Sequence, residues 1–538
     1  MHNKYKSYSL NELYAFLKRF NLSKSLHQIA CFNEILKFGY TKLKQGHNQP
    51  EARAFLSRLS EAQRLEFFLM STRLARFLIL SGANDYRDSV LNTRDGSLQT
   101  AINRIGQLSD KEVELTFKDP YDPIVLLGRI SHWQFPLQAP HKYTIGRGYL
   151  LFHKLLSTTN GDYDINKKMY QYFGIGSYEF LITGFTLWIK SDGLVNSKIP
   201  TKSNEMREII SPANQQRFLE LSSGSYQSYR EHLRGKDWKI MRKMAEVYGL
   251  DPFLKMPAIL PDRAGIVAAG TFIVPQPRYL LDRASTGIFY LLADKEQQLA
   301  LEANHKGRNP FRRMFGMLYR DYAKMYLCQS HGNSKFIDLD EDFTQIPGLR
   351  IPDFALISDN TCLLMEIKTS LLSVSSRTYY ELDKLEDEVR TGSLKKALTQ
   401  LQAFKSRLLA GELNDDRFEN VNEVYTVIIG YEDVYVLNGI LLPLMRKHYG
   451  AEITEGLQLG SISDLEIMGT ILQEGGDLVQ LMKEKYQDNM RSFYVISVAF
   501  ENYKKHENKI LKAAFDDYMN ELKSKFRECK MNCVKISK

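Results

Sequence analysis

The sequence lacks most of the patterns that mark secreted and membrane proteins. It has only five cysteines in 538 residues, too few for a disulfide framework in a chain of this length, so we expect reduced thiols. No apolar run approaches the roughly 18 residues that a membrane span needs, and no transmembrane helix is predicted. The basic first residues are not followed by a long apolar segment with a cleavage site. We therefore expect no signal peptide and a cytoplasmic protein.

Phosphate-binding loops are also missing. The glycine pairs Gly146/Gly148 and Gly174/Gly176 are not followed by Gly-Lys-Ser or Gly-Lys-Thr, and neither completes a G-x-G-x-x-G pattern. If ATP drives this protein, a second chain must supply the ATPase. The histidines, His153 among them, are isolated from any cluster of Cys, Asp or Glu at ligand spacing. We predict that they are surface or core residues and not catalytic ones.

Composition and charge fit a globular protein with an anionic partner. The chain is 43% hydrophobic and 25% charged, with a net charge of +9. Its length allows two to four domains, each with a sizeable core. The positive charge makes nucleic acid the first candidate partner. The alternative from charge alone is a lysine-rich surface without such a partner.

The order of the predicted elements divides the chain into four parts. Residues 1–260 have mostly helical periodicity and are predicted to form a regulatory or partner-binding region. Residues 261–300 are punctuated by proline and form a connector. Residues 301–437 follow the order helix, strand, hairpin strand, helix, strand, which predicts an α/β core with helices on a mixed sheet. Residues 438–538 return to a helical pattern. The expected fold is an α/β core within a larger, mostly helical chain.

Charged residues interrupt two apolar runs in the stretch from Leu349 to Ser370, LRIPDFALISDNTCLLMEIKTS. A polar break at 358–361 predicts a hairpin, and alternation places Glu366 and Lys368 on one face of its second strand. Asp353 would reach them from the first strand. Burying such charges without partners is costly, and a metal ion would be a suitable partner for the two carboxylates. Hard carboxylate oxygens suit Mg²⁺, with Mn²⁺ an expected substitute.

Pro352-Asp353 followed by Glu366-Ile367-Lys368 resembles the PD-(D/E)xK signature of the restriction-endonuclease-like nuclease superfamily. The resemblance covers about residues 305–437. It implies a mixed sheet flanked by helices and Mg²⁺-dependent hydrolysis of phosphodiester bonds. By resemblance, Asp353, Glu366 and the main-chain carbonyl of Ile367 bind the metal, and Lys368 positions or activates the attacking water.

A downstream helix adds a weaker likeness. Gln400-x-x-x-Phe404 is similar to the Gln-x-x-x-Tyr motif of exonuclease-type members, with Phe in place of Tyr. The resemblance therefore makes Gln400 a further site residue.

The upstream helix departs from the family pattern. Many members carry a glutamate one place after an aromatic residue there, whereas Tyr319 is followed by Arg320 in this chain. Asp321 is the nearest acid and a candidate substitute. Alternatively, Glu302 or no upstream acid contributes, or Asp321 pairs with a neighbouring cation on a solvated helix face.

The expected function is a Mg²⁺-dependent nuclease, most simply a DNA endonuclease in restriction, anti-phage defence or mobile-element biology. Its substrate backbone would be contacted by basic residues on the two helices, Arg312, Arg313, Lys395 and Lys396. Two cuts in a duplex would favour a homodimer, and a protein partner is another expectation. The alternative is a catalytically inactive nucleic-acid-binding or scaffold subunit of a larger complex, which Arg320 favours and the intact Asp353, Glu366 and Lys368 oppose.

Overall fold

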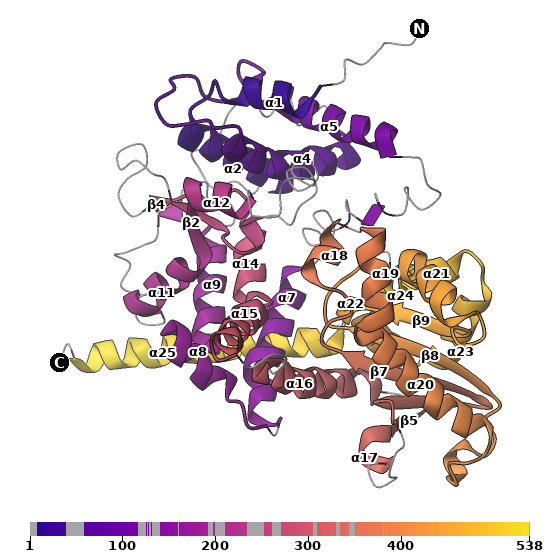
Figure 1. Ribbon diagram of the computed structural model, residues 1–538. Helices are drawn as coiled ribbons and strands as arrows, with labels where there is room; N and C mark the ends of the chain where they lie inside the picture. Colours follow the sequence, from indigo (N-terminus) through magenta and orange to yellow (C-terminus); the bar gives the residue numbers. More distant parts are fainter. Residues whose placement is uncertain are drawn as a thin grey trace.

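The computed structural model is a mixed α/β protein in which one five-stranded sheet and two two-stranded sheets are set among many helices (Figure 1). No helix in the described part of the chain has the length and apolar character that a membrane span requires. The structure describes residues 8–38, 57, 59–116, 125, 127–128, 131, 140–159, 161–191, 197–198, 210–233, 252–260, 271–304, 309–329, 334–343, 350–379, 381–435 and 437–536.

The N-terminal region is helical, as the periodicity predicted. Its long helices are α1 (Leu10–Leu17), α2 (Leu22–Phe38), α4 (Glu61–Leu80) and α5 (Ser97–Thr116). Two of them begin with a capping box, in which Ser9 and Ser60 are the N-cap residues. Their apolar faces share one core with Tyr226 and Tyr229. This bundle therefore packs against α12 (Tyr226–Leu233), as Figure 1 shows.

The middle of the chain joins helices to two small sheets. Strand β1 pairs antiparallel with β4, and β2 pairs parallel with β3. The elements are α7 (His141–Tyr149), the π-helical turn η3 (Leu150–Lys154), η4 (Leu155–Ser157), α8 (Ile165–Phe173), α9 (Ser177–Ser191), β1 (Ser197–Lys198), α11 (Pro212–Ser222), β2 (Ser223–Ser225), α12 (Tyr226–Leu233), η5 (Pro252–Leu254), β3 (Ala258–Leu260), β4 (Thr271–Phe272), α14 (Arg278–Ala284) and α15 (Gly287–Glu302).

The five-stranded sheet has the order β5-β6-β7-β8-β9 and is mixed. The first three strands are antiparallel neighbours, whereas β8 and β9 run parallel to β7. The predicted hairpin is confirmed: β6 and β7 are joined by Asp359 and Asn360, with Asp359 at a φ of 51°. The strands are β5 (Lys335–Asp338), β6 (Phe354–Ser358), β7 (Thr361–Lys368), β8 (Glu423–Gly430) and β9 (Leu457–Gly460).

Helices cover both faces of this sheet. Alternate residues of β7 separate the two cores: Leu363 and Met365 pack in the core that includes α16, while Cys362 and Leu364 pack in the core that includes α20. The predicted helix that carries Tyr319, Arg320 and Asp321 is α16, and Asn309 caps it. Helix α16 (Pro310–Leu327) precedes the sheet in the chain. The elements between its strands are α17 (Leu339–Phe343), α18 (Val374–Tyr379), α19 (Leu382–Thr391), α20 (Ser393–Leu409), η6 (Asp416–Phe418) and α21 (Leu437–Tyr449).

The region after residue 438 is not helical throughout, which corrects the sequence-based expectation. Strand β9 has four residues, too few for an alternating pattern to be distinguished from helix. Residues 431–435, which follow β8, form bends and a turn. Helix α25 packs along α7 (Figure 1). The helical elements are α22 (Ile462–Gln473), α23 (Leu478–Gln487), η7 (Arg491–Phe493), α24 (Ile496–Ala499), η8 (Glu501–Lys505) and α25 (Lys509–Ile536).

Candidate active site

The hairpin brings the two predicted carboxylates together. Phe354 lies opposite Met365 in the register of β6 and β7, so one step further along the pair places Asp353 opposite Glu366. The backbone N–H of Ile367 donates to Asp353 Oδ2 at 2.7 Å. Residues directly opposite each other have Cβ atoms only about 4.5–5.5 Å apart. The local strand pairing therefore fixes both carboxylates at one end of the hairpin.

Burial dominates the electrostatics of Glu366, whose side chain is 3% exposed. Its pKa is raised to about 8, first by burial and then by the charge of Asp353, with Lys368 acting in the opposite direction. Glu366 Oε1 accepts from Lys368 Nζ. The buried Oε2 atom accepts no hydrogen bond from the described residues. An orphaned carboxylate oxygen in a low-dielectric site is a position where a cation would be stabilising.

Asp353 is partly buried, with 18% of its side chain exposed. This partial burial raises the pKa of its carboxyl group, against the lowering effects of the Ile367 N–H, Lys368 and Arg320. Proximity of two carboxylates in one site opposes the ionisation of both. A cation bound beside Glu366 would therefore favour the ionised form of both carboxylates.

Gln400 holds Lys368 in the site. The ammonium donates to Gln400 Oε1 at 3.2 Å, and Gln400 Nε2 donates to the carbonyl of Ile351 at 3.2 Å. Gln400 lies on α20, and Lys368 and Glu366 point to that face of the sheet. Sequence reasoning placed Glu366 and Lys368 on one face of the strand, and the structure brings Gln400 to Lys368 on that face.

The main-chain carbonyl of Ile367 lies on the same side as Asp353. In a strand, the N–H and C=O of one residue point to the same neighbour, and the Ile367 N–H points to Asp353. Strand β6 begins at Phe354, opposite Met365, so Ile367 lies beyond the last paired residue of that ladder. Two carboxylates and a carbonyl, all hard oxygen donors, suit Mg²⁺. The described residues contain no group of three or more His, Cys, Asp or Glu placed to hold a metal, so an ion here would have two side-chain ligands.

The structure does not bring Asp321 to these carboxylates. Its Oδ2 accepts from Thr159 Oγ1 at 2.6 Å, on a different side of α16 from Arg320. The other acid considered, Glu302, accepts from Gln298 on its own helix. Arg320 reaches the site instead, with Nε 3.3 Å from Asp353 Oδ1.

The four predicted backbone-contacting residues lie near the starts of two helices. Arg312 and Arg313 are exposed on α16, and Lys395 and Lys396 are exposed on α20. Both helices pass close to the end of β7. Ser393 Oγ, at the start of α20, donates to the carbonyl of Ser370 at 2.6 Å. On α16, a Cβ added at Gly316 would lie 3.7 Å from Thr369 Cγ2. The exposed cations of the two helices that pass the end of β7 are suited to contact with the anionic backbone of a nucleic acid.

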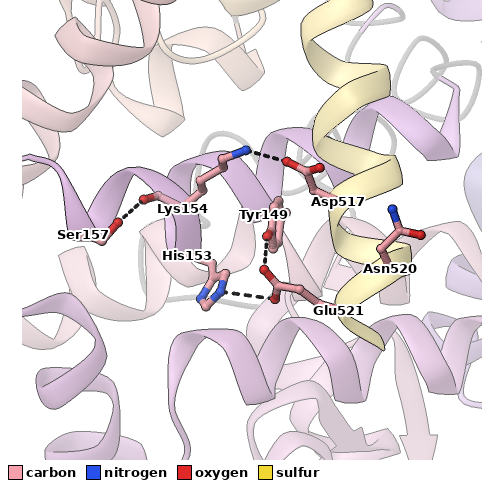
Figure 2. Close-up of a pocket in the computed structure, with 7 residues that line it drawn as sticks. All are labelled: Tyr149, His153, Lys154, Ser157, Asp517, Asn520 and Glu521. Carbon is pink, nitrogen blue, oxygen red and sulfur yellow. Dashed lines mark hydrogen bonds and ion pairs between the residues drawn. The ribbon is translucent and has the colours of Figure 1, made fainter. Parts of the chain in front are cut away.

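A second polar cluster lies between η3 and α25, where a pocket of about 470 Å³ opens (Figure 2). Glu521 accepts hydrogen bonds from Tyr149 and from Tyr178, the latter at 2.8 Å. His153 Nε2 lies 3.5 Å from Glu521 Oε2, and its ring stacks on Tyr178 with centroids 4.0 Å apart. Burial lowers the pKa of His153 although Glu521 acts in the opposite direction. No sequence pattern pointed to Glu521, because its partners are more than 300 positions away. Lys154 and Asp517 form an ion pair beside it.

Comparisons with known proteins add no family assignment. The chain matches no protein-family model and no curated protein. Its function must therefore be argued from the arrangement of its own residues.

Proposed function

We propose that this protein is a Mg²⁺-dependent nuclease that hydrolyses phosphodiester bonds, and that DNA is its substrate. One observation carries the proposal. Asp353, Glu366 and Lys368 meet at the end of a hairpin in a mixed sheet, and the buried Glu366 Oε2 has no hydrogen-bond partner among the described residues. A cation bound there would satisfy that oxygen and offset two like charges.

Each side chain has a distinct part in this proposal. Asp353, Glu366 and the Ile367 carbonyl would hold the divalent ion. Such an ion acts as a Lewis acid on the phosphate and lowers the pKa of bound water. Lys368, held by Gln400 at 3.2 Å, places a positive charge where negative charge develops during attack on phosphorus, and it orients the attacking water.

The wider setting follows from charge and symmetry. Arg312, Arg313, Lys395 and Lys396 would position the nucleic-acid backbone without reading its sequence. Cutting both strands of a duplex would need two copies of this site, so we include a homodimer in the proposal. A cytoplasmic DNA endonuclease of this kind would act in restriction, anti-phage defence or mobile-element biology, with a partner chain supplying any ATPase.

The second candidate is a catalytically silent nucleic-acid-binding or scaffold subunit. The observation that favours it is the ion pair between Arg320 and Asp353 at 3.3 Å, because a cation already neutralises one of the two carboxylates. Only the first candidate hydrolyses nucleic acid.

The test uses the purified full-length protein on plasmid, linear duplex DNA, single-stranded DNA and RNA, with Mg²⁺ and with EDTA. We expect cleavage of DNA with Mg²⁺ only, reduced about 10²-fold or more in Asp353→Asn and Lys368→Ala. The matched control is Lys384→Ala, which removes a lysine whose side chain is 50% exposed on α19. If the wild type and both site variants behave alike on every substrate, the nuclease proposal fails.

A further inference from the structure

Arg320 lies among several acidic groups and an aromatic ring. Its side chain is 16% exposed. One terminal nitrogen donates to Asp338 Oδ1, and Nε lies 3.3 Å from Asp353 Oδ1 and 3.8 Å from Asp340 Oδ2. The guanidinium carbon lies 4.9 Å from the centroid of the Phe354 ring. Three carboxylates and an aromatic face therefore surround one cation.

Two of the three acids around this guanidinium, Asp338 and Asp353, are held in place by backbone hydrogen bonding between neighbouring segments. Asp338 ends β5 and lies opposite Phe354 of β6, and the N–H of Leu339 donates to the carbonyl of Asp353 at 3.1 Å. Asp338 is further held by Lys324 Nζ at 2.8 Å. Because the backbone positions Asp338 and Asp353 without any ligand, the Arg320 guanidinium between them is a fixed part of the site.

Arg320 occupies one side of the Asp353 carboxylate. Oδ1 faces Arg320, and Oδ2 accepts from the N–H of Ile367. Each carboxylate oxygen can accept more than one partner, so a divalent ion could also bind on the side of Glu366. A second divalent ion on the Oδ1 side would have to take the place of the guanidinium, since like charges at contact distance repel strongly in a partly buried site.

We propose that Arg320 is a positioning residue that takes the place of a second divalent ion, so that this chain binds one such ion and not two. The inference rests on the proposed function. The inference goes beyond the proposed function because it specifies the number of divalent ions and the residue that sets that number.

The test counts Mn²⁺ bound per chain by equilibrium dialysis of the full-length protein, without any substrate. We expect one ion in the wild type and one in Arg320→Lys, which keeps the charge. We expect two in Arg320→Glu, because Asp338, Asp340 and Asp353 then lose their cation and gain a fourth carboxylate. The matched control is Arg407→Glu, an equal charge change at an exposed position of α20, for which we expect one ion.

The outcomes separate this inference from the proposed function. Two ions in the wild type would overturn the role of Arg320 and leave the nuclease proposal standing. No ion in the wild type would overturn the metal site itself. One ion in Arg320→Glu, with a wild-type circular dichroism spectrum, would also overturn the inference. If that variant does not fold, the wild type and Arg320→Lys decide: one ion in both supports the inference, and two in either overturns it.

Discussion

In the metal-free protein, the stability of Glu366→Gln relative to the wild type should increase as the pH rises. Burial and the charge of Asp353 raise the pKa of Glu366 to about 8, against an ordinary value of 4.5. Between these two values the folded protein holds a proton that the unfolded chain has lost. The free energy of unfolding of the wild type therefore falls as the pH rises through this window.

The size of the effect follows from the width of the window. Each pH unit within it corresponds to about 1.4 kcal/mol, so the wild type should lose about 3 kcal/mol relative to Glu366→Gln between pH 5 and pH 7. The variant has no proton to lose at this position. Its amide nitrogen can lack an acceptor, which costs about 1–3 kcal/mol, but this cost is the same at every pH. The difference between the two proteins therefore isolates the carboxyl group.

Urea unfolding in EDTA, followed by circular dichroism at pH 5, 6, 7 and 8, measures this difference. The matched control is Glu412→Gln at an exposed turn, for which the difference from the wild type should stay constant. If Glu366→Gln and the wild type differ by the same amount at pH 5 and at pH 8, the pKa of Glu366 is not raised in the folded protein.

Three further predictions concern other parts of the molecule. Gly469→Ala should cost about 1–3 kcal/mol, measured by urea unfolding, because the new Cβ would lie 2.9 Å from Tyr326 Cβ. Burial lowers the pKa of Lys485 to about 7, so wild-type stability should rise between pH 7 and 10.5 by about 1.4 kcal/mol per unit, a rise that Lys485→Met should lack in pH-dependent unfolding. Since burial lowers the pKa of His153, its NMR titration midpoint should lie below 6.5. Its contribution to stability should decline as the pH falls through 6.5. Glu521→Gln should lower the titration midpoint further, because Glu521 acts to raise this pKa.

Each of these has a control or a contradicting result. For the first, Gly316→Ala should be tolerated, since its nearest neighbour outside the adjacent residues is Thr369 Cγ2 at 3.7 Å; equal costs at both glycines would contradict the packing argument. For the second, a slope in Lys485→Met equal to that of the wild type would contradict it. For the third, a midpoint of His153 above 6.5 would mean that Glu521, and not burial, dominates.

The parts of this fold that could be predicted are those with long, regular patterns. The hairpin, α16 and α20 follow from alternation, a cap at Asn309 and helical spacing, and the hairpin alone places Asp353 beside Glu366. Strand β9 could not be predicted, because four residues carry no clear period.

The environment of the site was less predictable than its members. Arg320 was noted only as a departure from a pattern, because its contact with Asp353 depends on how α16 packs against the face of the sheet. The same packing turns Asp321 toward Thr159, although Asp321 is close in sequence to the position where many family members carry a glutamate. The contacts of Glu521 join segments more than 300 positions apart, which no local pattern records.

The most direct measurement of the central claim compares the rate of Mg²⁺-dependent DNA cleavage by the wild type, Glu366→Gln and Glu412→Gln. Glu366→Gln keeps the shape of the side chain and is expected to fold, so loss of activity in it reports on the carboxylate. The account predicts cleavage by the wild type and by Glu412→Gln at similar rates, abolition of both by EDTA, and a rate at least about 10²-fold lower in Glu366→Gln. Cleavage by Glu366→Gln at the wild-type rate would contradict it.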